Sequence, residues 1–173
     1  SEYCKSFARN SGFFGVDKAC QAYIIALGKN DLGCLKQELG TIEDVLSDTE
    51  GKETFARYYG EIIKRYKEIS PDARFFLMTL PNDDGLDYAE AHRDLIYKMA
   101  EIFEHTYVID FYKYGPKYDD KFKEQFFLSG HKNAFGYILT AKMVISYIDY
   151  IIRHNMDDFR KISLINTGIE YGI

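Results

Sequence analysis

The sequence predicts an α/β domain built on a parallel sheet, and three observations indicate it. Short apolar runs lie at residues 21–27, 74–80 and 106–110, which is the length and composition of buried strands. Between them, apolar side chains recur at helical spacing. A strand-helix-strand-helix-strand order of this kind joins parallel neighbours through right-handed crossovers. We therefore expect a parallel sheet whose first strand is covered on both faces.

The first half of the chain carries one strand and one helix ahead of the second strand. Residues 21–27 are almost continuously apolar and end at Gly28, whereas residues 29–52 are too rich in Gly, Asp and Thr to assign an element. A helix follows, with an apolar stripe of Phe55, Tyr59, Ile62, Tyr66 and Ile69. The sequence Ser-Pro-Asp at 70–72 stops it. The strand at 74–80 then leaves the sheet at Pro81.

The second half adds two helices and a short strand. The first helix has a stripe of Tyr88, Ala91, Leu95, Met99 and Ile102, and it leads into the strand at 106–110. Residues 113–123 are expected to form a charged, aromatic loop. Asn133 then caps the clearest helix of the chain, whose stripe is Ile138, Ala141, Ile145, Ile148 and Ile152. The tail is ambiguous, although residues 162–165 could add an edge strand.

Composition narrows the class of function. The chain has 173 residues, of which 46% are hydrophobic and 16% aromatic, so it can bury the core of one globular domain. Its 22 Lys and Arg against 27 Asp and Glu give a net charge of -5 without a basic block. Nucleic acid is therefore not an expected partner. Small neutral or weakly polar ligands fit this balance better than strongly anionic ones.

The sequence offers no sign of a membrane span, a disulfide framework or a metal site. No apolar run approaches the roughly 18 residues of a span, and no signal pattern opens the chain, which leaves localisation open between cytoplasm and secretion. Cys4, Cys20 and Cys34 are odd in number and have no close pair. We therefore expect free, buried or indifferent thiols, with no metal and no cofactor.

Two short motifs stand out at opposite ends of the chain. Residues 28–31 read Gly-Lys-Asn-Asp and close the first apolar run, and residues 130–137 read Gly-His-Lys-Asn-Ala-Phe-Gly-Tyr and open the long helix. In open parallel sheets, ligands bind beyond the carboxyl ends of the strands, where both motifs would lie. There Asn30 can donate to an oxyanion, with Gly28 turning the backbone, and His131 can act as a general base. The other histidines are expected to play no part.

These motifs resemble blocks of the SGNH, or GDSL-type, esterase and lipase family. Its third block is Gly-x-Asn-Asp after a central strand, and its fifth is a catalytic His just before the last helix. Residues 73–81 are similar to the strand between them, so the resemblance covers most of the chain. It implies one domain over 1–173: a three-layer αβα sandwich with a flavodoxin-like parallel sheet, incomplete at the N-terminus because one or more strands are missing. It also implies His131 and Asn30 as catalytic residues, with Gly28 and Asp31 supporting the oxyanion turn.

The chain departs from the family pattern at two places. No Gly-Asp-Ser nucleophile motif occurs, and Ser11 lacks the strand-turn-helix context that such a serine needs. The family places Asp three residues before the His, where this chain has Leu128. Another acceptor, with Asp83 and Asp84 as candidates, would have to orient His131, or a Ser-His dyad would act alone.

Several interpretations stay open. Phe127 and Leu128 are candidates for a substrate wall, although aromatic clusters of this kind more often serve packing. The first hypothesis is an ester hydrolase acting on acyl esters of small molecules, carbohydrates or lipids, with its nucleophilic Ser outside this chain. The second is a non-catalytic binding or structural remnant, and a phosphate binder is weaker because no Gly-rich loop follows any strand. A missing strand would also leave a sheet edge through which the chain could form a homodimer.

Overall fold

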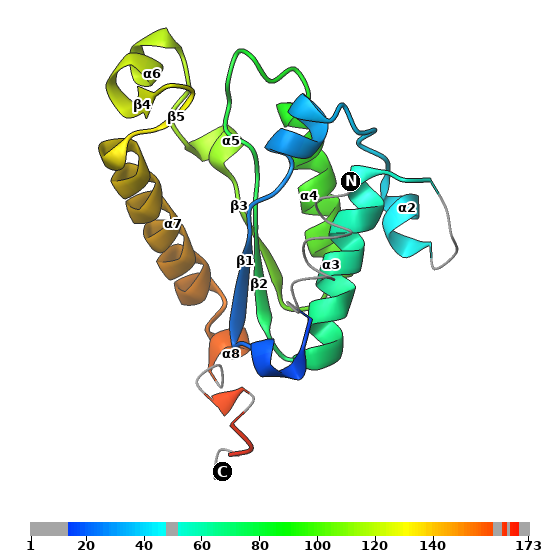
Figure 1. The fold of residues 1–173 in the computed structure, drawn as a ribbon. Helices are drawn as coiled ribbons and strands as arrows, with labels where there is room; N and C mark the ends of the chain where they lie inside the picture. The colour runs from blue at the N-terminus through cyan, green and yellow to red at the C-terminus, as the bar shows by residue number, and fades with distance from the viewer. Residues whose placement is uncertain (1–13, 48–51, 161–163, 166, 170–173) are drawn as a thin grey trace.

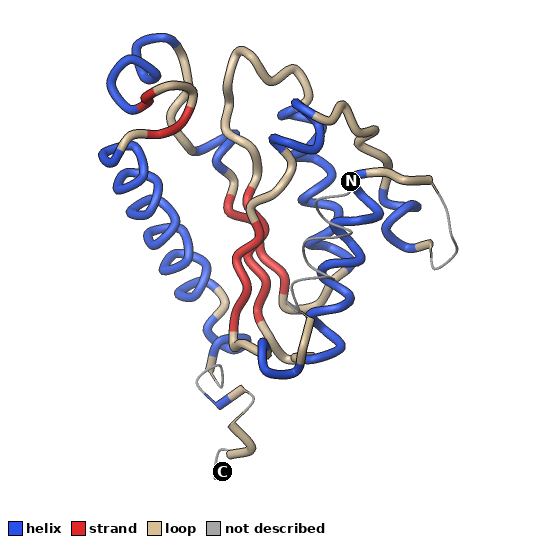
Figure 2. Tube along the Cα trace, in the orientation of Figure 1, coloured by secondary structure: helices blue, strands red, loops and turns tan. Residues whose placement is uncertain are grey.

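The computed structural model describes residues 14–47, 52–160, 164–165 and 167–169. Figure 1 shows a small central sheet with helices on either side of it, and Figure 2 separates helix, strand and loop along the same path. In chain order the elements are η2 (Val16–Lys18), β1 (Ala22–Ile25), η3 (Lys29–Cys34), α2 (Ile42–Leu46), α3 (Phe55–Ile69), β2 (Arg74–Met78), α4 (Ala89–Ile102), β3 (Thr106–Ile109), α5 (Phe111–Tyr114), α6 (Asp120–Phe126), β4 (Phe127–Leu128), β5 (His131–Lys132), α7 (Ala134–His154) and α8 (Met156–Phe159).

The central sheet is parallel, in the order β1-β2-β3. Phe76 in β2 pairs with Ile24 of β1 on one side and with Tyr107 of β3 on the other. The three predicted strands are therefore confirmed, each a few residues shorter than its apolar run. Among the described strands β1 forms one edge, and Ile24 there is 52% exposed.

Alternate side chains of β2 pack into two different cores. Phe75 and Leu77 are fully buried in a cluster shared with α3 and α4, whereas Phe76 packs with Ile151 of α7 and Phe159 of α8. This alternation follows from the two-residue period of a strand and explains why residues 75–78 are all apolar. The result is a mixed α/β structure with helices on both faces of the sheet (Figure 1), which is compatible with a three-layer α/β fold.

Two stretches that the sequence left unassigned contain short helices. Residues 29–52 include η3 and α2, and the expected loop at 113–123 contains the ends of α5 and α6. Local caps account for α5 and α6: Asp110 accepts from the N–H of Lys113, and Asp119 accepts from the N–H of Phe122. Such capped single turns carry no long apolar periodicity, so pattern reading misses them. The possible edge strand at 162–165 falls mainly outside the described residues.

The long helix α7 begins where the sequence predicts, because the Asn133 side chain accepts from the N–H of Gly136 at 2.9 Å. It runs for 21 residues, and within it an 18-residue window has a mean hydropathy of 1.3 with only 11% of its residues buried. By length and composition alone the helix could cross a membrane, which sequence reading did not single out. An amphipathic helix that packs on a sheet at one end can have the same length and composition. The α7 helix packs in this way, through Ile151 against Phe76 of β2.

The two described cysteines, Cys20 and Cys34, are both exposed, so of the buried and the indifferent thiols that the sequence allowed, neither is a buried one. Cys4 lies outside the described residues.

Candidate functional site

The first motif begins with a glycine that no other residue could replace without strain. Gly28 has φ of 127° and ψ of -32°, a region that L side chains rarely adopt. A Cβ built at this position would lie 2.8 Å from Nε2 of His92, so the backbone also approaches that ring too closely for a side chain. Gly28 thereby turns the chain sharply out of β1 and into η3.

Beyond Gly28 the motif winds into a π-helical turn. The N–H of Leu32 donates to the carbonyl of Gly28, and the N–H of Leu35 donates to the carbonyl of Asn30, both at 2.9 Å. Turns of this type are rare and occur frequently at functional sites. Asp31 is 3% exposed and its carbonyl accepts from Gln37, so it anchors the turn to the following loop.

Asn30 itself is exposed, not buried as an oxyanion donor was expected to be. Its Oδ1 accepts from the thiol of Cys34 at 3.9 Å, a contact within the same turn. The amide nitrogen of the side chain makes no hydrogen bond to another described residue. It is available to an external acceptor.

A buried histidine holds the ends of two strands together beneath this turn. His92 of α4 is fully buried; its Nε2–H donates to the Leu27 carbonyl at 3.1 Å, and its Nδ1 accepts weakly from the N–H of Leu80 at 3.5 Å. Burial lowers the pKa of His92 to about 4, against the hydrogen bond to Leu27 and the nearby Asp31, which act to raise it. The ring is therefore neutral and positions the loops after β1 and β2. The sequence indicated only that His92 sits in a helix.

The second motif is presented by a tight β-hairpin. Phe127 and Leu128 of β4 pair with Lys132 and His131 of β5, so Leu128 lies directly opposite His131. The two turn residues have positive φ, 50° at Ser129 and 83° at Gly130. This is the signature of a two-residue type I′ turn, for which glycine is favoured. Both Leu128 and His131 are exposed.

Asn133 clamps this hairpin between α6 and α7. Besides capping α7, it donates from its backbone N–H to the carbonyl of Phe126 and from Nδ2 to the carbonyl of Gln125, both at 2.8 Å. A Cβ at Gly136 would lie 2.4 Å from the Phe126 carbonyl oxygen, so only glycine permits this close approach. The Asn-Ala-Phe-Gly segment therefore fixes where His131 stands.

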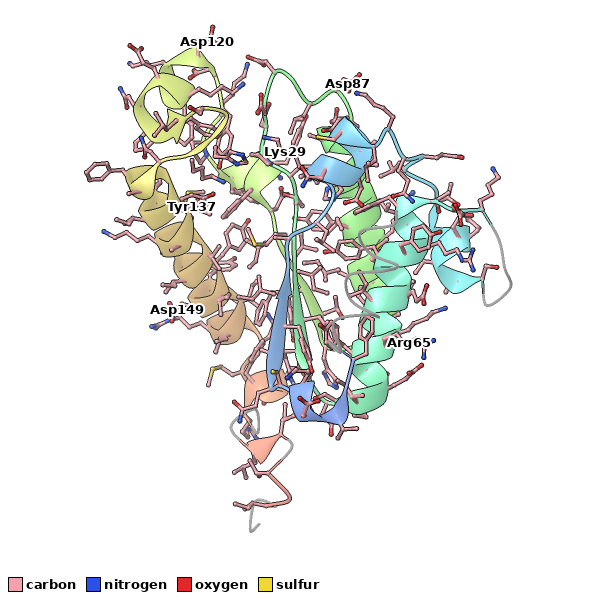
Figure 3. The ribbon with its side chains drawn as sticks, in the orientation of Figure 1. Lys29, Arg65, Asp87, Asp120, Tyr137 and Asp149 are labelled. Carbon is pink, nitrogen blue, oxygen red and sulfur yellow. The ribbon has the colours of Figure 1, made fainter. Side chains whose placement is uncertain are left out.

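A cavity of about 230 Å³ lies between these parts, beyond the carboxyl ends of β1 and β2. Lys29 of the first motif and His131 of the second both line it, as does Phe127. Figure 3 shows Lys29 at the start of η3 and Tyr137 on the first turns of α7. The remaining lining residues are Ala26, Leu27, Met78, Thr79, Leu80, Pro81, Phe111, Tyr118, Gly130, Lys132, Tyr137 and Thr140. Gly28, Asn30, Asp31 and Leu128 are not among the lining residues.

The acidic candidates for orienting His131 are engaged elsewhere. Asp83 pairs with Lys123 at 2.7 Å, and Asp84 pairs with Lys117 at 2.8 Å. Burial acts to raise the pKa of Asp83, but the hydrogen bonds from Lys123 and the Gly85 N–H outweigh it and lower that pKa. Within the described ranges, no side chain hydrogen-bonds to the His131 ring. An orienting acceptor would have to come with a ligand or from another segment.

A further buried carboxylate, Asp110, contacts a residue of the cavity wall. Asp110, fully buried, accepts from Arg93 at 2.9 Å, from the Tyr97 hydroxyl at 3.0 Å and from the Thr79 hydroxyl at 3.3 Å. Burial would raise the pKa of Asp110, but these donors and the Lys113 N–H together lower it. The carboxylate is thus ionised, and its hydrogen bond from the Thr79 hydroxyl helps to hold Thr79 in the cavity wall. Sequence reading treated it only as the end of a strand.

Over the part of the chain that the structure describes, no three His, Cys, Asp or Glu side chains are grouped as metal ligands would be. The cavity also takes in residues to which sequence reading gave no role in catalysis: Lys132 on β5, Tyr118 in the loop before α6 and Thr140 on α7. Lys132 stands inside the second motif, and Tyr118 belongs to the aromatic cluster before it, whereas no local pattern marks Thr140.

Comparison with known proteins adds one distant likeness. No protein-family model matches the chain, and no curated protein matches it. Among solved structures, a possible lipase from Chitinophaga pinensis DSM 2588 is similar, with 21% identity and a TM-score of 0.41 over 53% of this chain. The likeness spans 42% of that protein's length. At this identity and TM-score it carries no argument about this chain, which must rest on its own residues.

Proposed function

We propose that this chain carries part of the catalytic machinery of a serine ester hydrolase of the SGNH type. In this proposal His131 is the general base, the side chain of Asn30 is an oxyanion donor, and the nucleophilic serine comes from a segment outside these 173 residues. The fold would then be the flavodoxin-like αβα sandwich of that family. The substrate is an acyl ester, and neither a metal nor a cofactor takes part.

One observation carries the proposal: segments about one hundred residues apart in sequence line the same cavity. Lys29, which stands inside the Gly-Lys-Asn-Asp motif, and His131 both line it, whereas Asn30, the next residue after Lys29, does not. In this proposal the Asn30 side chain turns toward the cavity when the ester binds. The cavity lies beyond the carboxyl ends of parallel strands, which is where open α/β sheets bind ligands. The rigid supports of each motif, Gly28 against His92 and the clamp of Asn133, are the kind of packing that a preorganised site requires.

The chemistry follows from the roles of the two side chains. The serine hydroxyl attacks the ester carbonyl while His131 takes its proton, and the carbonyl oxygen becomes an oxyanion that the Asn30 amide stabilises. His131 then returns the proton to the leaving alcohol, and water hydrolyses the acyl-serine by the same route. Because no described side chain orients the ring, a Ser-His dyad fits this arrangement better than a triad with Asp83 or Asp84.

Labelling with a fluorophosphonate tests the mechanism on the protein purified from its natural source. We expect one serine to react and the labelled peptide to lie outside these 173 residues. His131→Ala should slow labelling and ester hydrolysis by about 10²- to 10⁴-fold, the usual contribution of a general base. Asn30→Ala should reduce the rate constant of hydrolysis by about 10²- to 10³-fold, as for other oxyanion donors.

The matched control is His154→Ala, which removes an exposed imidazole at the end of α7. It should leave both rates unchanged. Absence of labelling, labelling of a serine remote from the cavity, or equal rates in the His131 and His154 variants would refute the proposal.

An alternative function is non-catalytic ligand binding by the same cavity. It is favoured by the absence of a Gly-Asp-Ser motif and by Leu128 in place of an orienting acid. Under it, the 173-residue chain binds a ligand without turnover. Hydrolysis of p-nitrophenyl acetate that disappears in His131→Ala would exclude this alternative.

A further inference from the structure

Two lysines of the cavity form no ion pair with another described residue. Lys29 and Lys132 both line the cavity, one from each motif. By contrast, Lys117 and Lys123, on the segments just outside the cavity, are both in ion pairs. Lys29 is exposed and Lys132 is half-buried. Two cations that line one small cavity, one of them partly desolvated, indicate an anionic ligand.

The surroundings of Lys132 make its charge costly in the empty cavity. The side chain is half-buried, and its ammonium group lies 5.4 Å from the centre of the Tyr118 ring, which offers a weak cation-π contact. Burial lowers the pKa of Lys132, and the positive charge of Lys29 lowers it further. The charge of Lys132, which is partly desolvated and repelled by that of Lys29, would be stabilised by an anion placed between the two ammonium groups.

The other charged group beside the cavity does not supply this anion. Asp83 is buried and forms its ion pair with Lys123 at 2.7 Å; the charge of Lys29 also acts to lower the pKa of Asp83, but no ion pair joins these two residues. His131 adds a further group that can donate a hydrogen bond but no negative charge. The cavity is therefore locally positive in a chain whose net charge is -5.

We propose that this cavity binds the anionic group of a small acid, a carboxylate or a phosphate, between the ammonium groups of Lys29 and Lys132. The remaining wall is largely apolar, with Met78, Leu80, Phe111 and Phe127 among its residues. A volume of about 230 Å³ is below the range of drug-sized ligand sites, so the ligand has only a short apolar part. The net charge of -5, without a basic block, suggested a neutral or weakly polar ligand. The position of the two lysines points to an acid instead.

Together with the proposed function, on which this step rests, the acid would be part of the ester substrate. The lysines would hold its charged group at one end of the cavity, so that the ester carbonyl lies near His131. Binding of the anion itself does not depend on catalysis. The two ideas can therefore fail separately.

Titration with inorganic phosphate and with succinate, followed by NMR at constant ionic strength, tests the anion site. We expect saturable shifts of the amide signals of Lys29, His131 and Lys132, and the stronger of the two probes identifies the class of anion. Lys29→Gln and Lys132→Gln should each weaken binding by about 10-fold or more, the equivalent of about 1.4 kcal/mol. Lys142→Gln, an exposed lysine of α7, is the matched control and should bind as the wild type does.

Absence of saturable binding by both probes, or equal binding by all three variants and the wild type, would overturn the inference. If a fluorophosphonate labels a serine in a reaction that needs His131 while neither anion binds, the esterase stands and the acid-binding site is wrong. If an anion binds through both lysines and nothing is labelled, the site stands and the esterase is wrong.

Discussion

Acidification should destabilise this protein through one buried histidine, His92. Its ring is fully buried and neutral, bonded to the Leu27 carbonyl and to the N–H of Leu80, with no room for a proton on Nδ1. The pKa is about 4 in the folded chain and about 6.5 when the chain unfolds. Between these values the unfolded state binds more protons, so the free energy of unfolding falls as the pH falls.

The magnitude follows from the two pKa values. Stability from this source is fully present above about pH 6.5 and decreases down to about pH 4, by roughly 3 kcal/mol in total. Between pH 7 and pH 5 the expected loss is about 2 kcal/mol. That is a large share of the roughly 5–15 kcal/mol that stabilises an ordinary domain.

Urea denaturation of the wild type and of His92→Gln at pH 7, 6 and 5 measures this effect. Glutamine does not titrate, so the variant should be less stable at pH 7 but should lose about 2 kcal/mol less than the wild type on going to pH 5. His154→Gln, at an exposed site, should keep the pH dependence of the wild type. An NMR titration of the wild type gives an independent check, since the His92 ring should stay neutral at pH 5. A pKa of His92 near 6.5, or parallel pH dependences of wild type and His92→Gln, would refute the reasoning.

Two further predictions concern the turn and the sheet edge. Gly28→Ala should lower the free energy of unfolding by about 2–4 kcal/mol, since it adds a clash with the His92 ring to the strain of a positive φ. Gly130 also has a positive φ but has open space around it, so Gly130→Ala should lower the free energy of unfolding by only about 1–2 kcal/mol. Urea denaturation measures both losses. Equal losses would contradict this account. The chain should also dimerise through the edge of β1, and Ile24→Lys should keep it monomeric in light scattering; a wild type that stays monomeric at high concentration would disprove the interface.

Much of the fold could be predicted because its signals are local. Residues 75–78 are apolar at every position, and the structure explains this by burial of Phe75 on one face and Phe76 on the other. Asn133 is a good N-cap residue and is followed by an apolar stripe, so the start of α7 could also be predicted. The short helices α2, α5 and α6 escaped prediction, because a single capped turn has too few residues to show a period.

The candidate site was predictable only in part. Short motifs allowed His131 and the Gly-Lys-Asn-Asp turn to be predicted. The roles of Lys132 and His92, by contrast, depend on neighbours far away in the sequence. Nothing near His92 in the chain indicates that its ring will meet the backbone at Leu27. The candidate partners of His131, Asp83 and Asp84, form ion pairs with Lys123 and Lys117 in the structure, and Lys123 lies on a helix that the sequence did not predict.

The sequence by itself determined the strands, the long helices and the two motifs, because hydrophobic period, caps and turn residues act within a few positions of one another. Only the tertiary structure decided which side chains share the cavity, and hence that Lys29 and Lys132 accompany His131 in a chain with an excess of acids. The physical reason is that composition sums charge over the whole chain. The field at a site depends on the few charges that folding brings together and on the water that it removes from them.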